Sequence, residues 1–405
     1  MPFSPSERDI ITEEITKLLD KGVIEQIDRV QGDFISTIFV RPKKDGTFRM
    51  ILNLKQLNEF VSYYHFKMDT IQTALKLMCP GCFMASVDLK DAYYSVPIAL
   101  EDRKYLKFEW QGSYFQYTCV PNGLACAPRL FTKILKPFYS HLRSLGNICM
   151  GHIDDSFLLG YNYTACATNI QDTVDTFLNL GFVVHTEKSV LIPTQEMEFL
   201  GFLLNSVNMT IRLPSVKAER VRLACQSLLD KRKMTIREVA QVIGLMVSSF
   251  PAVQFGELYY RALERNKILA LQESRGNCDA PIYFSNESRS EIAWWVNNVD
   301  SSFKPIFQGD PDLTLTTDAC TSGWGAVNGA HKPGGLWNVD EKAFHINYLE
   351  LKAVQLGLKS LLGHVHGKHI RIQSDNRTTV AYVNNMGGIK SAECDSLSRK
   401  FGCGV

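Results

Sequence analysis

The most constraining feature of this sequence is that its short apolar stretches stop at aspartates. Residues 83–87 (FMASV) run directly into Asp88, and residues 148–160 (ICMGHIDDSFLLG) place Asp154 and Asp155 between two apolar runs. Short apolar runs bounded by turn residues are typical of β-strands, and aspartate favours turns. The sequence therefore predicts a strand that ends at Asp88 and a hairpin with a two-residue Asp-Asp turn, with three carboxylates at neighbouring strand ends.

These carboxylates suit a hard divalent cation, because Mg²⁺ prefers oxygen ligands. Two such ions about 4 Å apart can activate an attacking hydroxyl and stabilise a leaving pyrophosphate. Because successive strand residues point to opposite faces, Asp154 and Asp155 cannot bind equally. We predict Asp154 as the ligand shared with Asp88, and Asp155 as a weaker contributor. The alternative is an ordinary Asp-Asp turn, with Asp88 as a helix cap.

The remaining pattern predicts a mixed α+β chain. Apolar spacing predicts a helix over 9–21, Asp45-Gly46 predicts a hairpin turn, and Thr235 with Glu238 forms a capping box before a helix. A stretch of turn residues around the Trp294-Trp295 helix (274–312) suits a tether. A βαβ-type pattern follows, so we place domain boundaries near 215 and 312.

Composition bounds the class of protein. A length of 405 residues predicts two or three domains. The 44 basic and 42 acidic residues leave a net charge of +2, which does not favour a basic nucleic-acid binder. Residues 217–237, however, hold seven basic and two acidic residues. Such helices could follow a nucleic-acid backbone or could be simply solvated, and the nucleic-acid-binding candidates are Lys231, Arg232, Lys233 and Arg237.

Eleven cysteines are too sparse for a disulfide scaffold, so we expect a reduced intracellular protein of the cytoplasm or nucleus. No segment approaches the ~18 apolar residues of a membrane-spanning helix, and the N-terminus lacks the apolar core of a signal peptide. Cys79 and Cys82 have metal-binding spacing. Because no second pair lies nearby, a Pro-Gly turn is favoured there.

Six motifs in order resemble the fingers and palm of reverse transcriptases over roughly residues 30–205. The first aspartate lies in SVDLKDAYYSVPI and the second pair in GHIDD, where His152 replaces the family's usual tyrosine. The other four are a basic hairpin with FRMILNLKQLN, PNGLACAPRLF, LGFVVHTEKS, and EFLGF at the position of the primer grip. The resemblance implies a right-hand polymerase with fingers, palm and thumb and an antiparallel palm sheet.

The resemblance also implies residue roles. Basic side chains of the fingers hairpin would fold over a triphosphate, with Arg49 as a bidentate ligand. Tyr93 would exclude a ribose 2′-OH, and Lys188 would protonate the leaving pyrophosphate. Backbone amides of 89–92 could also hold phosphate oxygens. The alternatives are a solvated basic hairpin, a core aromatic and a surface lysine. The predicted nucleotide-binding set is Lys43, Lys44, Arg49, Tyr93 and Asn122.

A second acidic set follows in the C-terminal part. Asp318 and Asp375 end predicted strands, Glu350 lies in a predicted helix, and carboxylates placed so suit a two-metal hydrolytic centre. TDACTSGWGA, YLELKAV and QSDNRTTVAYVNNMGG together resemble the ribonuclease H domain, most closely that of DIRS-like, tyrosine-recombinase retrotransposons. That family has a fourth carboxylate and a histidine further downstream. Asp395 is too close to Asp375 to supply it, so we expect an incomplete domain with apolar sheet uncovered.

The expected function is therefore RNA-directed DNA synthesis in a retrotransposon, with two Mg²⁺ ions, or Mn²⁺ in their place. The expected partners are an RNA template, a DNA or RNA primer, an RNA–DNA hybrid and dNTPs. The expected domains are fingers and palm (1–215), thumb and tether (216–312) and an incomplete ribonuclease H-like domain (313–405). One alternative is a catalytically decayed nucleic-acid-binding remnant, and another is an enzyme that only cleaves hybrids.

Overall fold

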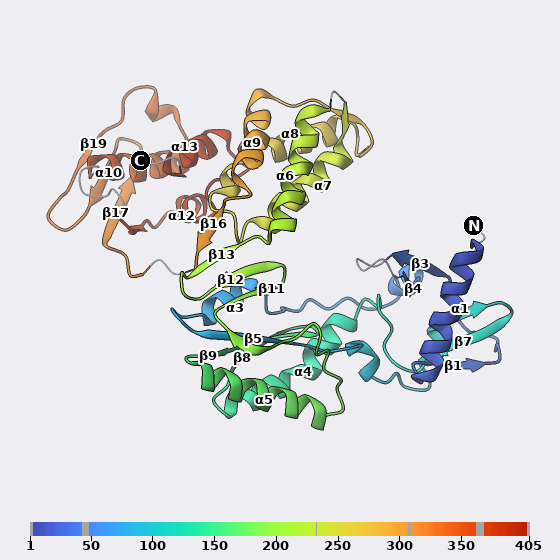
Figure 1. Cartoon of the computed structure of the whole chain (residues 1–405). Helices are drawn as coiled ribbons and strands as arrows, with labels where there is room; N and C mark the ends of the chain where they lie inside the picture. Colours follow the sequence, from blue (N-terminus) through green and yellow to red (C-terminus); the bar gives the residue numbers. More distant parts are fainter. Residues whose placement is uncertain (1–2, 43–47, 232, 307–308, 362–367, 403–405) are drawn as a thin grey trace. The chain divides into compact units, whose positions relative to one another are not determined.

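The strand predicted to end at Asp88 lies inside a four-stranded antiparallel sheet. Strand β5 (Phe83–Asp88) pairs with β9 (Asp155–Gly160) and β10 (Val190–Thr194), and β8 (Ile148–His152) completes the order β10-β5-β9-β8. Helices α4 (Ala127–Ser144) and α5 (Tyr163–Asn179) pack on this sheet (Figure 1). The strands are buried runs such as Ser156–Gly160, so the apolar pattern is explained by a covered sheet.

The computed structural model describes residues 3–42, 48–231, 233–306, 309–361 and 368–402. The chain divides into two compact units, residues 1–197 and 198–405, which are described separately below. Within the described residues, no helix is long and apolar enough to cross a membrane.

The hairpin that carries the aspartate pair has a different register from the predicted one. His152 pairs with Asp155, so the two-residue turn is Ile153-Asp154, and Asp155 is the first residue of β9. Ile153 adopts a left-handed backbone with φ of 57°, which is a costly conformation for a β-branched residue. The expected Asp-Asp turn is therefore wrong by one residue, and this shift places Asp155 directly opposite Asp88 in the sheet.

The rest of the first unit lies outside this sheet. Helix α1 (Pro5–Asp20) buries Ile11, Ile15 and Leu18, as its apolar spacing predicts. A second sheet has the order β1-β7-β6-β2, and a separate hairpin pairs β3 with β4 around the predicted turn, whose residues 43–47 lie outside the described part. Their bounds are β1 Ile24–Ile27, β2 Ile35–Ser36, β3 Ile38–Pro42, β4 Phe48–Leu52, α2 Lys55–Asn58, α3 Ile71–Leu77, η1 Ala92–Ser95, η2 Arg103–Tyr105, β6 Lys107–Trp110 and β7 Ser113–Tyr117.

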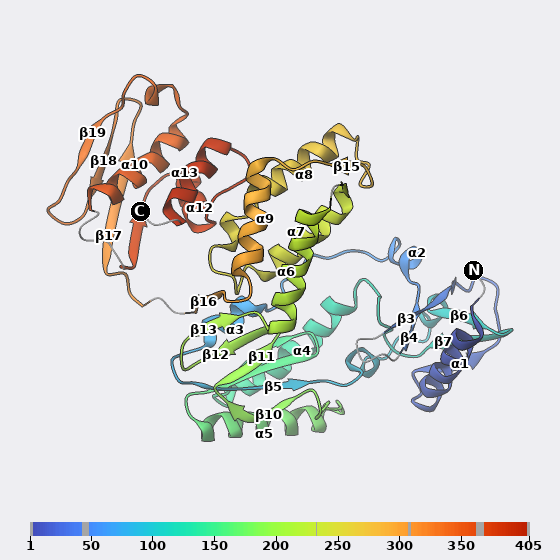
Figure 2. The ribbon, with the colours of Figure 1, turned by 45° about the horizontal axis from the view of Figure 1, so that its top comes forward.

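Four helices dominate the first half of the second unit. They lie side by side in Figure 2, and the contacting pairs are α6 with α7, α7 with α8, α8 with α9, and α6 with α9. Their bounds are α6 Ser215–Asp230, α7 Ile236–Ser249, α8 Arg261–Glu273 and α9 Asn286–Asn298, with η3 Gly256–Leu258 and the short strands β14 Met234–Thr235 and β15 Pro281–Ile282 between them. The capping box of Thr235 and Glu238 at the start of α7 is confirmed.

The helix around Trp294 and Trp295 is not a tether. It is α9, and Trp295 is fully buried against the other helices. The chain then forms β16 (Phe303–Pro305), which adds to the sheet β11-β12-β13-β16, whose other strands are β11 Glu196–Phe199, β12 Phe202–Asn205 and β13 Thr210–Arg212. The turn residues of 274–285 form the connection between two packed helices, α8 and α9, and not a tether between domains.

A mixed sheet forms the C-terminal part of the second unit. The order is β19-β18-β17-β20, in which β17 and β20 are parallel and the other pairs are antiparallel. Helix α10 packs on β17 and β18, and α12 and α13 pack on α10. The bounds are β17 Leu313–Ala319, β18 Gly323–Val327, β19 Gly334–Leu336, η4 Glu341–Ala343, α10 Ile346–Ser360, β20 Ile370–Gln373, α12 Arg377–Asn384 and α13 Ala392–Gly402.

The expectation of an uncovered apolar sheet is wrong for the two central strands. Leu315 and Thr317 of β17 are buried on the helix side, whereas the alternate residue Thr316 is exposed. Thr316 donates its hydroxyl proton to Oε1 of Gln373 on β20 at 2.9 Å. Because strand residues alternate between faces, the outer face of β17 carries polar residues such as Thr316 and needs no helix over it.

Candidate active site

A pocket of about 530 Å³ in the first unit collects most of the predicted polymerase residues. Asp88 comes from the end of β5, and Asp154 comes from the β8–β9 turn. Tyr93, Asn122 and Lys188 line the same pocket, although they come from three separate segments of the chain. The polar lining and the two carboxylates make this pocket the candidate active site.

Hydrogen bonds of the backbone fix Asp88 in place. Its N–H donates to Oγ of Ser189 at 3.0 Å, and its carbonyl accepts from the N–H of His185 at 2.8 Å. The N–H of Leu89 donates to the carbonyl of Asp154 at 3.0 Å, which ties the end of β5 to the neighbouring turn. The two aspartates are therefore held by the sheet itself, which is the preorganisation that a metal or catalytic site requires.

The carboxylates oppose one another electrostatically. Burial, followed by the negative charge of Asp88, raises the pKa of Asp154, while Lys188 and His152 act against this shift. Burial and the charges of Asp154 and Asp88 raise the pKa of Asp155 to about 6. A divalent cation would relieve this repulsion, so the donor set fits Mg²⁺ or Mn²⁺. Asp155 does not line the pocket, and its side chain hydrogen-bonds to Asp88.

The aromatic and basic candidates surround these carboxylates. Tyr93 packs edge-on against Phe131 at a ring-centroid distance of 5.5 Å. Burial and the nearby charge of Asp154 raise the pKa of Tyr93 to about 12, so the phenol stays neutral. His152, which replaces the family's tyrosine, is half-buried, and its Nδ1 lies 2.6 Å from the carbonyl oxygen of Asp69.

Part of the predicted triphosphate site is not placed. Lys43 and Lys44 lie outside the described residues, and Arg49 lies in β4, where its backbone pairs with that of Arg41. The expectation that all amides of 89–92 could hold phosphate is wrong. The N–H of Leu89 is bonded to Asp154, and that of Lys90 donates to the carbonyl of Val183 at 2.8 Å.

One wall of the pocket comes from a segment that none of the sequence motifs contains. Glu14, Lys17 and Lys21 of the first helical segment line it together with the two aspartates. Lys17 lies 2.7 Å from Glu13 and 3.3 Å from Glu14, and Lys21 lies 2.6 Å from Asp91. The spacing of 14, 17 and 21 along one helix face is the only signal in the sequence, and nothing in it indicates that this face meets the β5 end.

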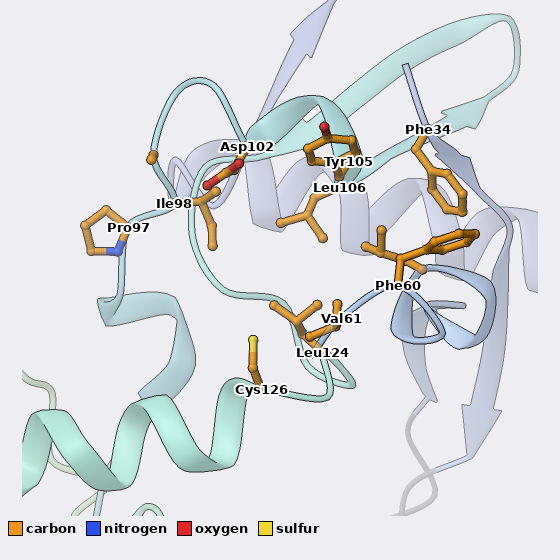
Figure 3. A pocket seen from close by; sticks show the side chains of 12 residues that line it. Phe34, Phe60, Val61, Pro97, Ile98, Asp102, Tyr105, Leu106, Leu124 and Cys126 are labelled. Atoms are coloured by element: carbon orange, nitrogen blue, oxygen red, sulfur yellow. The ribbon is translucent and has the colours of Figure 1, made fainter. Parts of the chain in front are cut away.

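A second cavity in the first unit, of about 730 Å³, has a different character. Figure 3 shows Phe34, Phe60 and Leu106 among the side chains around it, with Asp102 as its one charged group among the lining residues. An apolar lining offers no ligand for a phosphate or a metal. The pocket with Asp88 and Asp154 therefore remains the candidate active site.

The second acidic set also comes together. Ligand oxygens of Asp318, Glu350 and Asp375 all lie within 4.8 Å of one another, and no other group of three or more acidic, histidine or cysteine side chains does so within the described ranges. Burial, followed by the charges of Asp318 and Asp375, raises the pKa of Glu350 to about 7. The buried Oε2 of Glu350 has no hydrogen-bond partner, so this oxygen fits a divalent cation as ligand.

The predicted basic stretch is partly neutralised. Lys231 lies 2.8 Å from Glu238, and Arg237 lies 2.8 Å from Asp279, which is distant in sequence. Arg232 lies outside the described residues, and Lys233 is exposed. Ion pairs at such exposed positions are weak, and phosphate oxygens can compete for these cations.

Residues 41–204 match the family described as "Reverse transcriptase (RNA-dependent DNA polymerase)". This part of the chain is therefore similar to reverse transcriptase domains.

About half of the chain is similar to the polyproteins of foamy viruses and of Tf2 retrotransposons. The Pro-Pol polyprotein of Simian foamy virus type 1 is 27% identical over 202 residues, which is 50% of this chain and 17% of the polyprotein. The Transposon Tf2-3 polyprotein of Schizosaccharomyces pombe is 22% identical over 209 residues, or 52% and 15% of the two chains. The aligned region thus covers less than one fifth of either polyprotein.

Two solved structures share the fold. The foamy viral protease-reverse transcriptase in complex with dsDNA matches with a TM-score of 0.66 at 18% identity, over 92% of this chain and 75% of that one. The same protein in complex with RNA/DNA hybrid gives a TM-score of 0.64 at 16% identity, over 99% and 53%.

Proposed function

We propose that this protein is an RNA-directed DNA polymerase that extends a primer by nucleotidyl transfer. The observation that carries this proposal is the single pocket that contains Asp88, Asp154, Tyr93, Asn122 and Lys188. The proposed substrates and partners are dNTPs, an RNA template, a DNA or RNA primer and the RNA–DNA hybrid. The complexes of the foamy viral protein with dsDNA and with RNA/DNA hybrid support this choice.

In this mechanism Asp88 and Asp154 would hold two Mg²⁺ ions, for which Mn²⁺ could substitute. When bound, these ions lower the pKa of the attacking primer 3′-OH and neutralise charge on the phosphates. Lys188 lines the same pocket, where its charge opposes the rise in the pKa of Asp154, and its ammonium group could give a proton to the leaving pyrophosphate. Tyr93 closes the space that a 2′-OH would need. Arg49, Lys43 and Lys44 remain the proposed ligands of the triphosphate.

The test is primer extension on an RNA template. Asp154→Asn removes a charged ligand, so extension should fall by at least about 10²-fold, as expected for loss of a group that acts on the transition state. The matched control is Asp175→Asn, because Asp175 is exposed on α5 and its carboxylate accepts hydrogen bonds from Gln171. Full activity of Asp154→Asn would show that Asp154 is not an essential metal ligand. A wild type that binds primer–template but extends nothing would favour the decayed remnant.

We propose a second divalent-metal site at Asp318, Glu350 and Asp375 in a ribonuclease H-like domain. Only three carboxylates meet there among the described residues, so we expect metal binding without hybrid cleavage by this chain. In calorimetry with Mn²⁺, the Glu350→Gln variant should show one binding event fewer than the wild type. Degradation of the RNA strand of a hybrid by the wild type, but not by Glu350→Gln, would instead support the cleaving enzyme.

The finer assignments are proposals as well. Membership of a DIRS-like element rests on the three C-terminal motifs, and a tyrosine-recombinase gene beside this sequence in its source DNA would support it. Domain boundaries near 215 and 312 and a thumb surface with Lys231, Arg232, Lys233 and Arg237 rest on the sequence pattern. Charge removal at Lys233, which is exposed, should weaken primer–template binding and reduce its salt dependence.

A further inference from the structure

Helix α1 contributes a charged side chain to the proposed nucleotide pocket. Lys21 follows the last residue of α1, and its Nζ lies 2.6 Å from Oδ2 of Asp91. The side chains are 50% and 41% exposed, and both residues line the pocket that holds Asp88 and Asp154. This ion pair joins two segments that are 70 residues apart in the sequence.

Asp91 places a carboxylate on the wall of a pocket that is proposed to bind a negatively charged triphosphate. It lies between the metal-binding candidate Asp88 and the gate candidate Tyr93, and it has a left-handed backbone with φ of 53°. A triphosphate carries several negative charges, so a carboxylate on the wall of its pocket would repel it unless a cation compensates. Lys21 is the cation in contact with Asp91. Lys17, the other lysine of α1 in the pocket, is already compensated by Glu13 and Glu14.

We propose that Lys21 is a positioning residue for the incoming nucleotide. It neutralises Asp91 and holds that carboxylate toward α1 and away from the triphosphate. This inference rests on the proposed polymerase function and adds to it a residue that none of the sequence motifs contains. The other charged groups on the pocket wall are Lys17 with its partner Glu14, Lys90, and the three that the proposed chemistry already uses, Asp88, Asp154 and Lys188.

The ion pair is not needed for the fold. Exposed ion pairs contribute little to stability, and α1 is held by its buried Ile11, Ile15 and Leu18. The end of the helix is fixed by the backbone, since the N–H of Val23 donates to the carbonyl of Leu18 at 2.9 Å. Variants of Lys21 should therefore fold, which a thermal melt can check directly.

The experiment is steady-state primer extension with varied dNTP concentration. Lys21→Met should raise the KM for dNTP about tenfold, as expected for one uncompensated charge near a surface site, and should leave kcat within about twofold. Lys21→Arg should keep a normal KM. In the double variant Lys21→Met/Asp91→Asn the KM should return toward that of the wild type, because no carboxylate remains to be compensated. Lys267→Met serves as the control, since it removes a lysine that is paired with Glu264 at 2.8 Å on α8.

Two results would overturn the inference. One is a normal KM in Lys21→Met. The other is a double variant as impaired as the single one, which would show that Asp91 is not what Lys21 compensates. If the wild type extends no primer, the proposed function fails. The same comparison is then made on dNTP binding, by calorimetry with a dideoxy-terminated primer–template and Mg²⁺, and equal affinities of wild type and Lys21→Met would reject the inference separately.

Discussion

Gly151 decides how closely the aspartate hairpin packs on the helix behind it. A Cβ atom at this position would lie 2.2 Å from the ring of Tyr139. The hydroxyl of Tyr139 shares a hydrogen bond of 2.7 Å with the buried Ser156, which follows Asp155. The position of both aspartates therefore depends on a glycine three residues before Asp154.

Gly151→Ala should destabilise the protein by about 1–3 kcal/mol, because the extra methyl group overpacks a filled site, and should lower primer extension as the turn moves. The control is Gly244→Ala in α7, where a Cβ would meet nothing within 4 Å and alanine should stabilise the helix by about 0.5–1 kcal/mol. Urea unfolding measures both. An unchanged midpoint for Gly151→Ala would contradict the packing described here.

Tyr93→Ala should lower the preference for dNTPs over rNTPs at least about tenfold, because the side chain that closes the space for the 2′-OH is removed. Tyr93→Phe keeps the ring against Phe131 and should keep the preference. The measurement is the ratio of kcat/KM for the two nucleotides. Equal ratios in Tyr93→Ala and the wild type would make Tyr93 a core aromatic only.

At the scale of elements, the start of α7 shows how local chemistry fixes a boundary. Glu238 accepts hydrogen bonds from the N–H and the hydroxyl of Thr235, and its other oxygen lies 2.8 Å from Nζ of Lys231. The hydrogen bond from Lys231, followed by that from the Thr235 amide, lowers the pKa of Glu238 to about 2. A carboxyl with a lowered pKa stabilises the folded state when it is charged.

Glu238→Gln should therefore cost about 0.5–1 kcal/mol at pH 7, since glutamine can cap the helix but cannot pair with Lys231. The contribution of Glu238 is fully present above its ordinary pKa of 4.5 and is lost as the pH falls toward about 2. The difference in unfolding free energy between the two proteins should shrink over this range. A difference that stays constant with pH would show that the charge of Glu238 does not stabilise the fold.

At the scale of the whole molecule, buried ions join the helices of the second unit. Asp395 on α13 is 1% exposed and accepts from Arg265 of α8 at 2.8 Å. Arg399 of α13 is bonded to the buried Glu291 of α9 and lies 3.3 Å from Glu287. Asp395, which sequence analysis excluded from the metal set, thus has a different partner: it packs α13 against the helices that precede the mixed sheet.

Asp395→Ala should destabilise the second unit by about 3–5 kcal/mol, because it removes a buried partner of Arg265 and leaves this partly buried arginine only the half-exposed Glu287 at 3.6 Å. The matched control is Asp300→Ala. Asp300 is 53% exposed and pairs with Arg222 at 2.9 Å, so its loss should cost at most about 1 kcal/mol. Chemical denaturation of the two variants compares buried with exposed pairs. Equal small losses would mean that α13 is held by apolar contacts alone.

The sequence by itself determined what depends on neighbouring residues. Apolar runs and turn residues predicted β5, β8 and β9, and the capping box predicted the start of α7. The order of motifs gave Asp88, Asp154, Tyr93, Asn122 and Lys188 as candidates, and these residues line one pocket. These are local patterns, in which a residue and its near neighbours carry the information.

Only the tertiary structure decided what depends on residues far apart in the chain. The turn at Ile153-Asp154 follows from the pairing of β8 with β9, and one residue of register set Asp155 opposite Asp88. The pairing of Lys21 with Asp91 follows from packing. The pairing of Arg237 with Asp279 does as well, so the positive charge of residues 217–237 is partly compensated in the fold. Charge compensation and strand register are long-range properties, because they are fixed by which surfaces meet and not by the order of residues.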